Sequence, residues 1–191
     1  MNRNLAYTTS ALALLGIGWY VVTKVLPART RSGIMAAVGN EVARQLSELR
    51  PDLTDPERAL AGAIVASQAA LETDNGATPA WVRGWNFSNL TAGPYWTGAT
   101  ITAGDTAPDA AGNYMPISQR FRSYPSLAAA VSDYLTALSW PQYRAARDSL
   151  MAGDAAGFAR NLHSGGWYTA PEAGYEAAVV GGVDDALGMI A

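Results

Sequence analysis

The chain has 191 residues, of which 49% are hydrophobic and 15% are charged, and its formal net charge is −3. This length allows one domain of ordinary size with a short appendage, and the composition can fill a hydrophobic core, which argues against an intrinsically disordered chain. The negative balance argues against nucleic acid as a partner, and the absence of cysteine excludes disulfide scaffolds, cysteine zinc sites and thiol nucleophiles.

The first element is an uncharged, mostly apolar run over residues 5–23. As a helix it would span roughly 28 Å, which matches the hydrocarbon core of a membrane. Trp19 lies near its end and Lys24 follows it, as is typical of a membrane interface. A cleaved signal peptide is the alternative, but no small-residue cleavage pattern follows cleanly. We therefore predict that residues 1–31 form a membrane anchor and its flank, with one N-terminal transmembrane helix. Residues 32–191 are predicted to form one domain.

The next elements are two helices and an irregular region. Apolar residues at helical spacing predict the first helix over residues 34–49. The second helix begins at Thr54 or Asp55, either of which can serve as its N-cap, and extends to the turn at Gly76. Residues 81–120 have no sustained helical period and are rich in Gly, Thr, Asn, Pro and aromatic residues, which predicts loops and a short hairpin.

Helical patterns return after Pro125. Ser126 is the expected N-cap of the next helix, and further helices are expected near Pro141, near Asp154 and from Tyr175 onward. We therefore predict an α+β fold that is mostly α, in which a small irregular or β lobe is inserted between the helices of a larger lobe.

Glu72 is the most informative acid, because it ends a strongly apolar helix in the segment QAALETDNG. Steps of four residues place it on the same helix face as Gln68 and Ile64. Partial desolvation and the negative end of the helix dipole are both expected to raise the pKa of its carboxyl group. An acid that is still protonated near neutral pH is what the cleavage of a glycosidic bond requires. The alternative is a glutamate that only decorates a helix end.

Asp105 and Asp109 are the candidates for a second carboxylate, and we expect both of them in a flexible polar loop. Either could act as a base, or orient a water or the acetamido group of a sugar, although Asp is also a common turn residue. The expected loops also hold Trp96, Trp167 and Tyr168, whose aromatic faces suit sugar rings. The alternative for each aromatic residue is a place in the core.

Four blocks in chain order resemble the motifs of one family, the glucosaminidases of glycoside hydrolase family seventy-three, which include the flagellar peptidoglycan hydrolase domain. The blocks are AIVASQAALETDNG, FSNL with YWTG, FRSYPSLAAAVSDYLTAL, and GGWYTAPEAGY, and the resemblance extends from about residue 56 to residue 183. It implies a lysozyme-like helical lobe, a smaller β lobe and a cleft for the glycan strands of peptidoglycan.

The resemblance also implies site residues. Glu72 takes the position of the general acid, and the second carboxylate falls nearest Asp109, with Asp105 as its rival. Matched or neighbouring positions provide the following candidates for substrate contact: Asn89, Trp96, Tyr124, Trp167 and Tyr168. Residues 91–93 are Thr-Ala-Gly where the family has Phe-Gly-Ile, and the second acid is an aspartate instead of a glutamate. We therefore expect a different cleft floor and a shorter reach of the second acid.

The implied function is that of a peptidoglycan hydrolase in which Glu72 protonates the glycosidic oxygen. The sequence leaves open whether the enzyme is a glucosaminidase, a muramidase or a lytic transglycosylase. No cofactor is expected. His163 is the only histidine, so the chain cannot form a histidine-rich metal site. We expect His163 at a helix end or on the surface. The competing hypothesis is a catalytically inactive wall-binding or virion structural protein with the same fold.

The expected location is a membrane, with the catalytic domain acting on the periplasmic cell wall. The flanking charges conflict with this expectation, because Arg3 precedes the apolar run while Lys24, Arg29 and Arg31 follow it, and the positive-inside rule then keeps the domain in the cytoplasm. Two hypotheses remove the conflict. The protein belongs to the membrane of a virus particle, with virion or envelope proteins as partners, or the run is a weakly hydrophobic signal anchor that can leave the bilayer.

Overall fold

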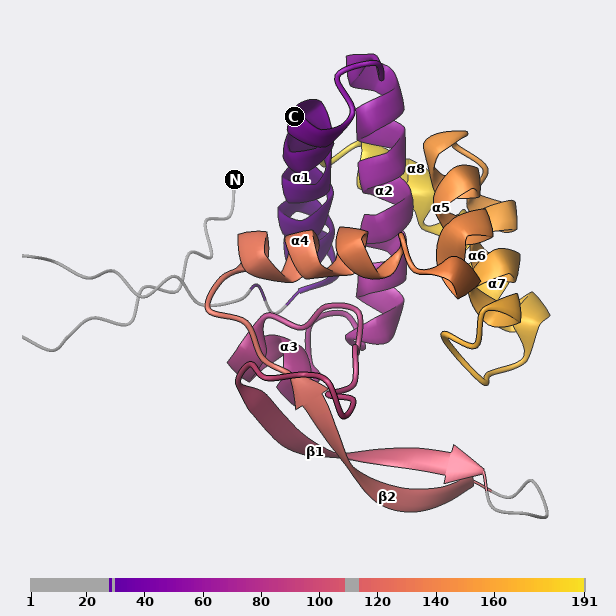
Figure 1. The fold of residues 1–191 in the computed structure, drawn as a ribbon. Helices are drawn as coiled ribbons and strands as arrows, with labels where there is room; N and C mark the ends of the chain where they lie inside the picture. The colour runs from indigo at the N-terminus through magenta and orange to yellow at the C-terminus, as the bar shows by residue number, and fades with distance from the viewer. Residues whose placement is uncertain (1–27, 29, 109–113, 191) are drawn as a thin grey trace, which may run out of the picture.

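The computed structural model describes residue 28 and residues 30–108 and 114–190. In this part of the chain, a lobe of helices carries a two-stranded antiparallel hairpin at one end (Figure 1). The fold is therefore mostly helical with one small sheet, as the sequence predicts.

The elements follow one another along the chain with the hairpin in the middle. The helices before the hairpin are α1 (Arg31–Leu49), α2 (Asp55–Glu72) and α3 (Pro79–Gly84). The hairpin consists of β1 (Thr100–Pro108) and β2 (Tyr114–Arg122). The elements after it are α4 (Leu127–Ala137), the 3-10 helix η1 (Pro141–Tyr143), α5 (Arg144–Met151), α6 (Ala155–Ser164), α7 (Glu172–Gly181) and α8 (Val183–Leu187).

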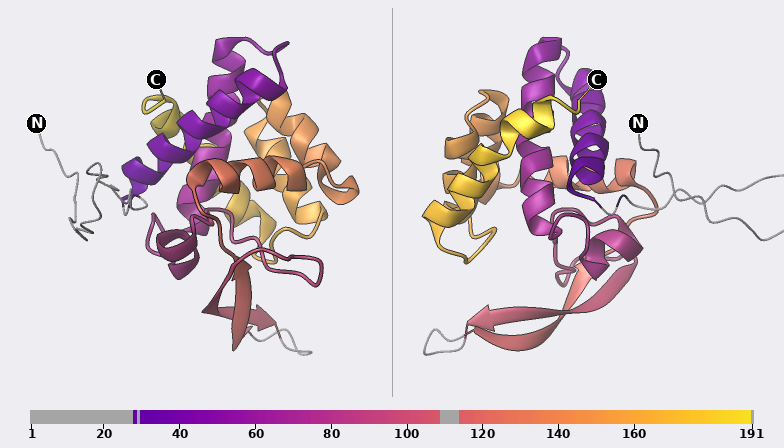
Figure 2. Two further views of the ribbon diagram at one scale, coloured as in Figure 1. Left: turned by 60° about the vertical axis from the view of Figure 1, so that its left-hand side comes forward. Right: turned by 180° about the vertical axis from the view of Figure 1, so that it is seen from behind.

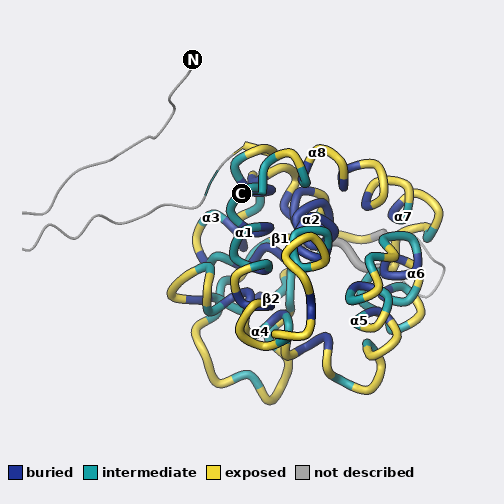
Figure 3. Tube along the Cα trace, turned by 90° about the horizontal axis from the view of Figure 1, so that it is seen from above, coloured by how far each residue is buried: buried dark blue, intermediate teal, exposed yellow. Residues whose placement is uncertain are grey.

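Helix α2 runs through the middle of the helical lobe, with α1 on one side and α5 to α8 on the other (Figure 2). Its start is fixed by a capping box in which the side chain of Thr54 accepts from the backbone of Glu57 and the side chain of Glu57 accepts from the backbone of Thr54. Its middle is buried all round, as the dark blue tube in Figure 3 shows. Because α2 is packed on all sides, its last residue, Glu72, is held on a rigid element.

Helices α1 and α2 approach closely because both have a glycine at the crossing. A Cβ atom on Gly62 would lie 2.5 Å from the carbonyl oxygen of Gly39, so only glycine fits at this position. The core continues on both sides of this contact with apolar side chains from most of the helices. Its largest fully buried members are Trp81, Tyr134, Phe87, Phe158, Ile34, Met35, Ile64, Leu138, Leu150 and Leu162.

The helices predicted from the sequence are confirmed, with small differences at their ends. Ser126 caps α4 by accepting from the backbone of Ala129, and Asp154 caps α6 by accepting from the backbone of Gly157. The element expected near Pro141 begins as a 3-10 helix and continues as α5. The final helix begins before Tyr175 and is followed by the short helix α8.

The irregular region holds more regular structure than the sequence predicts. The hairpin is long, because β1 and β2 pair from Thr100 with Arg122 to Pro108 with Tyr114. Both strands of a two-stranded sheet are edge strands, which can contain prolines such as Pro108 and Pro116 at positions where no ladder hydrogen bond is needed. The same register pairs Asp105 of β1 with Ile117, so the expectation that Asp105 lies in a loop is wrong. Asp109 lies outside the described residues.

The apolar run of residues 5–23, which is predicted to form the transmembrane helix, also lies outside the described residues, because these begin at Ala28. Among the helices that the structure describes, none has the length and apolar character needed to cross a bilayer.

Candidate active site

Glu72 is the last residue of α2, and its side chain is half-buried at the junction of the helical lobe and the loops below it. The chain reverses immediately after it, in a turn where Asp74, Asn75 and Gly76 all have positive φ angles of 47°, 54° and 96°. The buried hydroxyl of Thr73 stabilises this turn, because it donates to Ala69 O and accepts from the backbone of Gly76. The reversal leaves the carboxyl group of Glu72 at the exposed end of an apolar helix.

Two side chains from distant segments hold the carboxyl group of Glu72. Asn89 donates from Nδ2 to Glu72 Oε2 at 3.1 Å and also to the backbone oxygen of Glu72 at 2.6 Å. Tyr175, from α7, donates its hydroxyl to Glu72 Oε1 at 2.7 Å. Each carboxyl oxygen therefore accepts a hydrogen bond from a protein side chain.

A chain of hydrogen bonds supports Tyr175 from the buried side. Gln68, one turn before Glu72, donates from Nε2 to the hydroxyl of Tyr175 at 3.0 Å, and its Oε1 accepts from the hydroxyl of Tyr134 at 2.5 Å. Burial and the charge of Glu72 raise the pKa of both tyrosines well above the usual value. Tyr175 consequently stays protonated near neutral pH and acts as a donor to Glu72, not as a base.

The segment after α6 supports Tyr175 from another direction. Tyr168 stacks on Tyr175 with ring centroids 3.6 Å apart and an interplanar angle of 14°, and its hydroxyl donates to Ala159 O. Trp167 packs edge-on against Tyr134 at 5.5 Å. Both aromatic residues predicted in the last family block thus lie beside the network that contains Glu72.

His163 lies in the last turn of α6, in agreement with the helix-end interpretation. Its Nδ1 is 3.2 Å from a carboxyl oxygen of Glu172, at the start of α7, and its ring is 5.1 Å from that of Tyr168. These contacts place His163 beside the Tyr168 ring. Among the described residues, no group of three His, Asp or Glu side chains could hold a metal ion.

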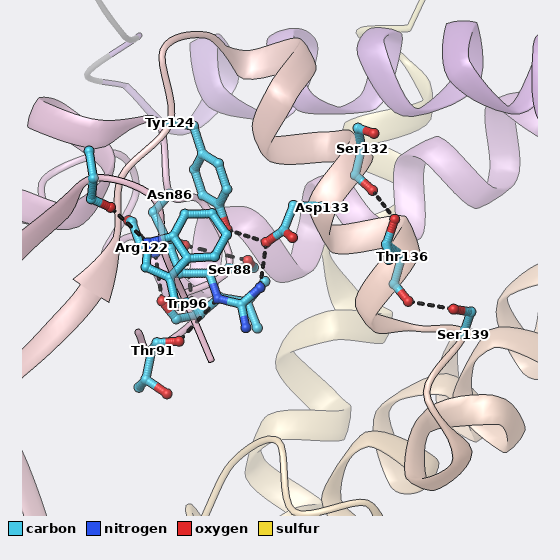
Figure 4. A network of polar contacts seen from close by, with 12 residues as sticks. Asn86, Ser88, Thr91, Trp96, Arg122, Tyr124, Ser132, Asp133, Thr136 and Ser139 are labelled. Atoms are coloured by element: carbon cyan, nitrogen blue, oxygen red, sulfur yellow. Dashed lines mark hydrogen bonds and ion pairs between the residues drawn. The ribbon is translucent and has the colours of Figure 1, made fainter. Parts of the chain in front are cut away.

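A second cluster of polar and aromatic side chains lies where the hairpin joins α4 (Figure 4). Trp96 and Tyr124, both predicted from the sequence to contact substrate, meet edge to face at 5.7 Å. They line a pocket of about 440 Å³ together with Gly98, Ala99, Ser123, Pro125, Ala129 and Asp133. Tyr124 donates its hydroxyl to Asp133 Oδ2 at 2.6 Å, and burial together with this carboxylate raises the pKa of Tyr124.

The structure brings together some of the predicted site residues and leaves the others untested. Glu72 and Asn89 are hydrogen-bonded to each other, and Trp96 and Tyr124 share a pocket. Asp105 is placed only by its backbone in β1. The proposed roles of Asp105 and Asp109 as second carboxylate therefore stay predictions.

Sequence reasoning overlooked Tyr175 and Gln68 as site residues. Both left a signal, since Tyr175 ends the last of the four family blocks and Gln68 shares the helix face of Glu72. Neither signal predicts the hydrogen bond between Gln68 and Tyr175, because the two residues are 107 positions apart in the chain.

Comparison with known proteins identifies the fold and the family. The model of the glucosaminidase family, described as mannosyl-glycoprotein endo-beta-N-acetylglucosaminidase, matches residues 56–184. A peptidoglycan hydrolase mutant from Sphingomonas sp. A1 superposes with a TM-score of 0.61 and is 25% identical, with 84% of this chain and 98% of that chain covered.

Two further solved structures share the fold. A C-terminally truncated glycoside hydrolase domain of FlgJ from Salmonella typhimurium is 23% identical, with a TM-score of 0.53 and coverage of 81% of this chain and 96% of that chain. The catalytic domain of the autolysin Auto from Listeria monocytogenes is 15% identical, with a TM-score of 0.61 and coverage of 83% and 85%. A search of curated proteins finds no match.

The matched residues 56–184 include Glu72, Asn89 and Tyr175, so the residues that meet at the C-terminal end of α2 fall inside the family region. The chain belongs to the glucosaminidase family.

Proposed function

We propose that this domain is a peptidoglycan hydrolase that cleaves the glycosidic bond following N-acetylglucosamine, with Glu72 as the general acid. The observation that carries the proposal is the half-buried carboxyl group of Glu72, which Asn89 and Tyr175 hold at the end of α2 inside the family region. The similarity to the Sphingomonas peptidoglycan hydrolase supports cell-wall glycan as the substrate.

The proposed reaction begins with the protonated form of Glu72. Its O–H group donates to the glycosidic oxygen while the bond from that oxygen to the anomeric carbon breaks, and positive charge develops on the sugar ring. Water then adds to the anomeric carbon and loses a proton to a base. Asp109 is the candidate for this base. Where the acetamido group of the sugar instead stabilises the anomeric carbon, the Glu72 carboxylate left by the first step takes the proton of the water. Asn89 and Tyr175 fix the carboxyl group of Glu72 so that little reorganisation is needed when its proton leaves.

Trp96 and Tyr124 are proposed to contact the glycan. The pocket that they line has two aromatic side chains and the carboxylate of Asp133, which is a combination that suits a sugar with apolar faces and hydroxyl groups. We also propose that the glycan is contacted nearer to Glu72 by Asn89, Trp167 and Tyr168.

The membrane anchor is a separate proposal. An uncharged run over residues 5–23 with Trp19 near its end and Lys24 after it supports a single-pass anchor in residues 1–31. The domain of residues 32–191 would then act on the periplasmic cell wall from a bacterial envelope or from the membrane of a virus particle.

The proposed function is tested by digesting purified peptidoglycan with the full-length chain. The released fragments are reduced with borohydride and examined by mass spectrometry. The proposal predicts fragments that end in reduced N-acetylglucosamine. Reduced N-acetylmuramic acid would indicate a muramidase, anhydro ends would indicate a lytic transglycosylase, and binding to peptidoglycan without release of fragments would indicate a wall-binding protein.

A further inference from the structure

The Asn89 loop, which we define as residues 86–91, carries the amide that contacts the catalytic carboxyl group. Asn89 has a left-handed backbone with a φ angle of 52°, and its side chain donates twice to Glu72. Asparagine tolerates this conformation better than most residues, but it is still less favourable than an extended or right-handed helical one. The contact with Glu72 therefore depends on other groups that hold the loop in place.

Backbone contacts fix both ends of this loop. The buried side chain of Asn86 donates to Leu90 O and to Arg122 O, each at 2.9 Å, and accepts from the backbone of Leu90. The backbone of Arg122 donates to Leu90 O at 2.9 Å, and Thr91 forms an isolated bridge with Phe121. The loop is thus attached to the end of β2, and Arg122 is the residue at which the attachments meet.

The side chain of Arg122 extends this attachment to the helical lobe (Figure 4). Its Nε donates to Thr91 O at 3.1 Å, and its Nη1 donates to Asp133 Oδ2 in α4 at 2.7 Å. The guanidinium group lies 4.7 Å from the ring centroid of Trp96 and 5.5 Å from that of Trp140. Only 11% of the side chain of Arg122 is exposed, so this ion pair is shielded from solvent much more than a surface pair.

We propose that Arg122 is a positioning residue for catalysis, which holds the Asn89 loop between β2 and α4 so that Asn89 stays hydrogen-bonded to Glu72. The inference rests on the proposed function of Glu72. This positioning role requires the planar guanidinium group of arginine, because one side chain must donate to a backbone carbonyl and to a carboxylate in different directions while it stacks on aromatic rings. A lysine keeps the charge but can satisfy only part of this set.

Arg122→Lys tests the proposal, with Arg120→Lys as the matched control. Arg120 lies two residues earlier on the same strand, is exposed, and contacts only Thr100 Oγ1 among the hydrogen-bond partners described for its side chain. In the full-length chain acting on a soluble glycan fragment of peptidoglycan, Arg122→Lys should lower kcat by roughly tenfold, as expected when a hydrogen bond to a charged group is weakened. Arg122 also contacts Trp96 and Asp133 in the proposed glycan pocket, and the rise in KM through these contacts should be smaller than the fall in kcat. Arg120→Lys should leave both constants at the wild-type values.

A double-mutant cycle with Asn89→Ala separates positioning from a general loss of structure. If Arg122 acts through Asn89, then Arg122→Lys should not lower kcat further in a chain that already lacks the amide of Asn89. The same fractional loss of kcat in both backgrounds would overturn the proposal, as would a change that is confined to KM. If Arg122→Lys does not fold, Asp133→Asn removes the anion that orients the guanidinium group. The same cycle is then measured on kcat alone, because Asp133 also lines the proposed glycan pocket.

The outcome is also distinguishable from a failure of the proposed function. A wild-type chain that releases no glycan fragments would contradict the role of Glu72. A wild-type chain that cleaves the fragment, with an Arg122→Lys variant that turns over equally fast, would contradict only the role of Arg122.

Discussion

Replacing Tyr175 by phenylalanine removes one hydroxyl group from the active site and leaves the aromatic ring that stacks on Tyr168. The lost hydrogen bond to Glu72 is one to a charged group, which is typically worth about 1.5–3 kcal/mol. We therefore expect kcat to fall between about tenfold and a hundredfold. The amide of Gln68 also loses its acceptor in a buried position, so the free energy of unfolding should fall by about 1–3 kcal/mol.

Tyr134→Phe is the matched comparison, because it also removes a buried tyrosine hydroxyl that contacts Gln68, whereas the hydroxyl that donates to Glu72 is that of Tyr175. Urea unfolding should show a similar loss of stability in the two variants, whereas turnover of a soluble peptidoglycan fragment should fall much more in Tyr175→Phe. Equal activities of the two variants would refute the claim that the Tyr175 hydroxyl acts on the carboxyl group.

Three further predictions concern the second acid, alkaline stability and the anchor. If Asp109 activates the water, Asp109→Asn should lower kcat roughly a hundredfold or more, as the loss of a general base does. Asp105→Asn should then have little effect, and the kcat of both variants on soluble fragments decides which aspartate is the base. Burial, followed by the charges of nearby glutamates, raises the pKa of Tyr168 to about 12 from a usual value near 10, so its contribution to stability is present below pH 10 and is lost as the pH rises toward 12. Unfolding curves measured across this range should show the loss, and a flat profile would contradict it. The full-length chain should partition into detergent or membranes, whereas a truncated variant that begins at Ser32 should stay in the aqueous phase; aqueous partitioning of both, with the N-terminus intact, would exclude the anchor.

The sequence predicts the helices of this fold well because their signals are local. The caps at Thr54, Ser126 and Asp154 each need only a side chain and a backbone group three residues later. Apolar residues at helical spacing then identify the face that each helix buries.

The hairpin is the part of the fold that the sequence hides. Its strands contain Pro108, Pro116 and Gly104, which usually indicate turns, and its pairing is defined by a partner strand and not by either strand alone. The sequence consequently predicts a loop at Asp105, although this residue belongs to β1.

The candidate site could be predicted only as far as single residues carry its chemistry. Glu72 is recognisable because an acid at the end of an apolar helix is unusual, and Asn89 because of the family block that contains it. The donor from Tyr175 is 103 positions away from Glu72, and the ion pair between Arg122 and Asp133 joins a strand to a helix. Such contacts follow from the tertiary arrangement, which no local pattern specifies.

The central claim, that Glu72 is the acid catalyst of a peptidoglycan hydrolase, is tested most directly by the turnover of Glu72→Gln. This substitution keeps the size of the side chain and removes its transferable proton, so the variant should fold with a melting temperature near that of the wild type. General acid catalysis usually contributes about 10²- to 10⁴-fold, so release of glycan fragments from purified peptidoglycan should fall by at least about two orders of magnitude. Near-normal release of fragments by the folded Glu72→Gln variant would contradict the assignment of this residue and the mechanism built on it.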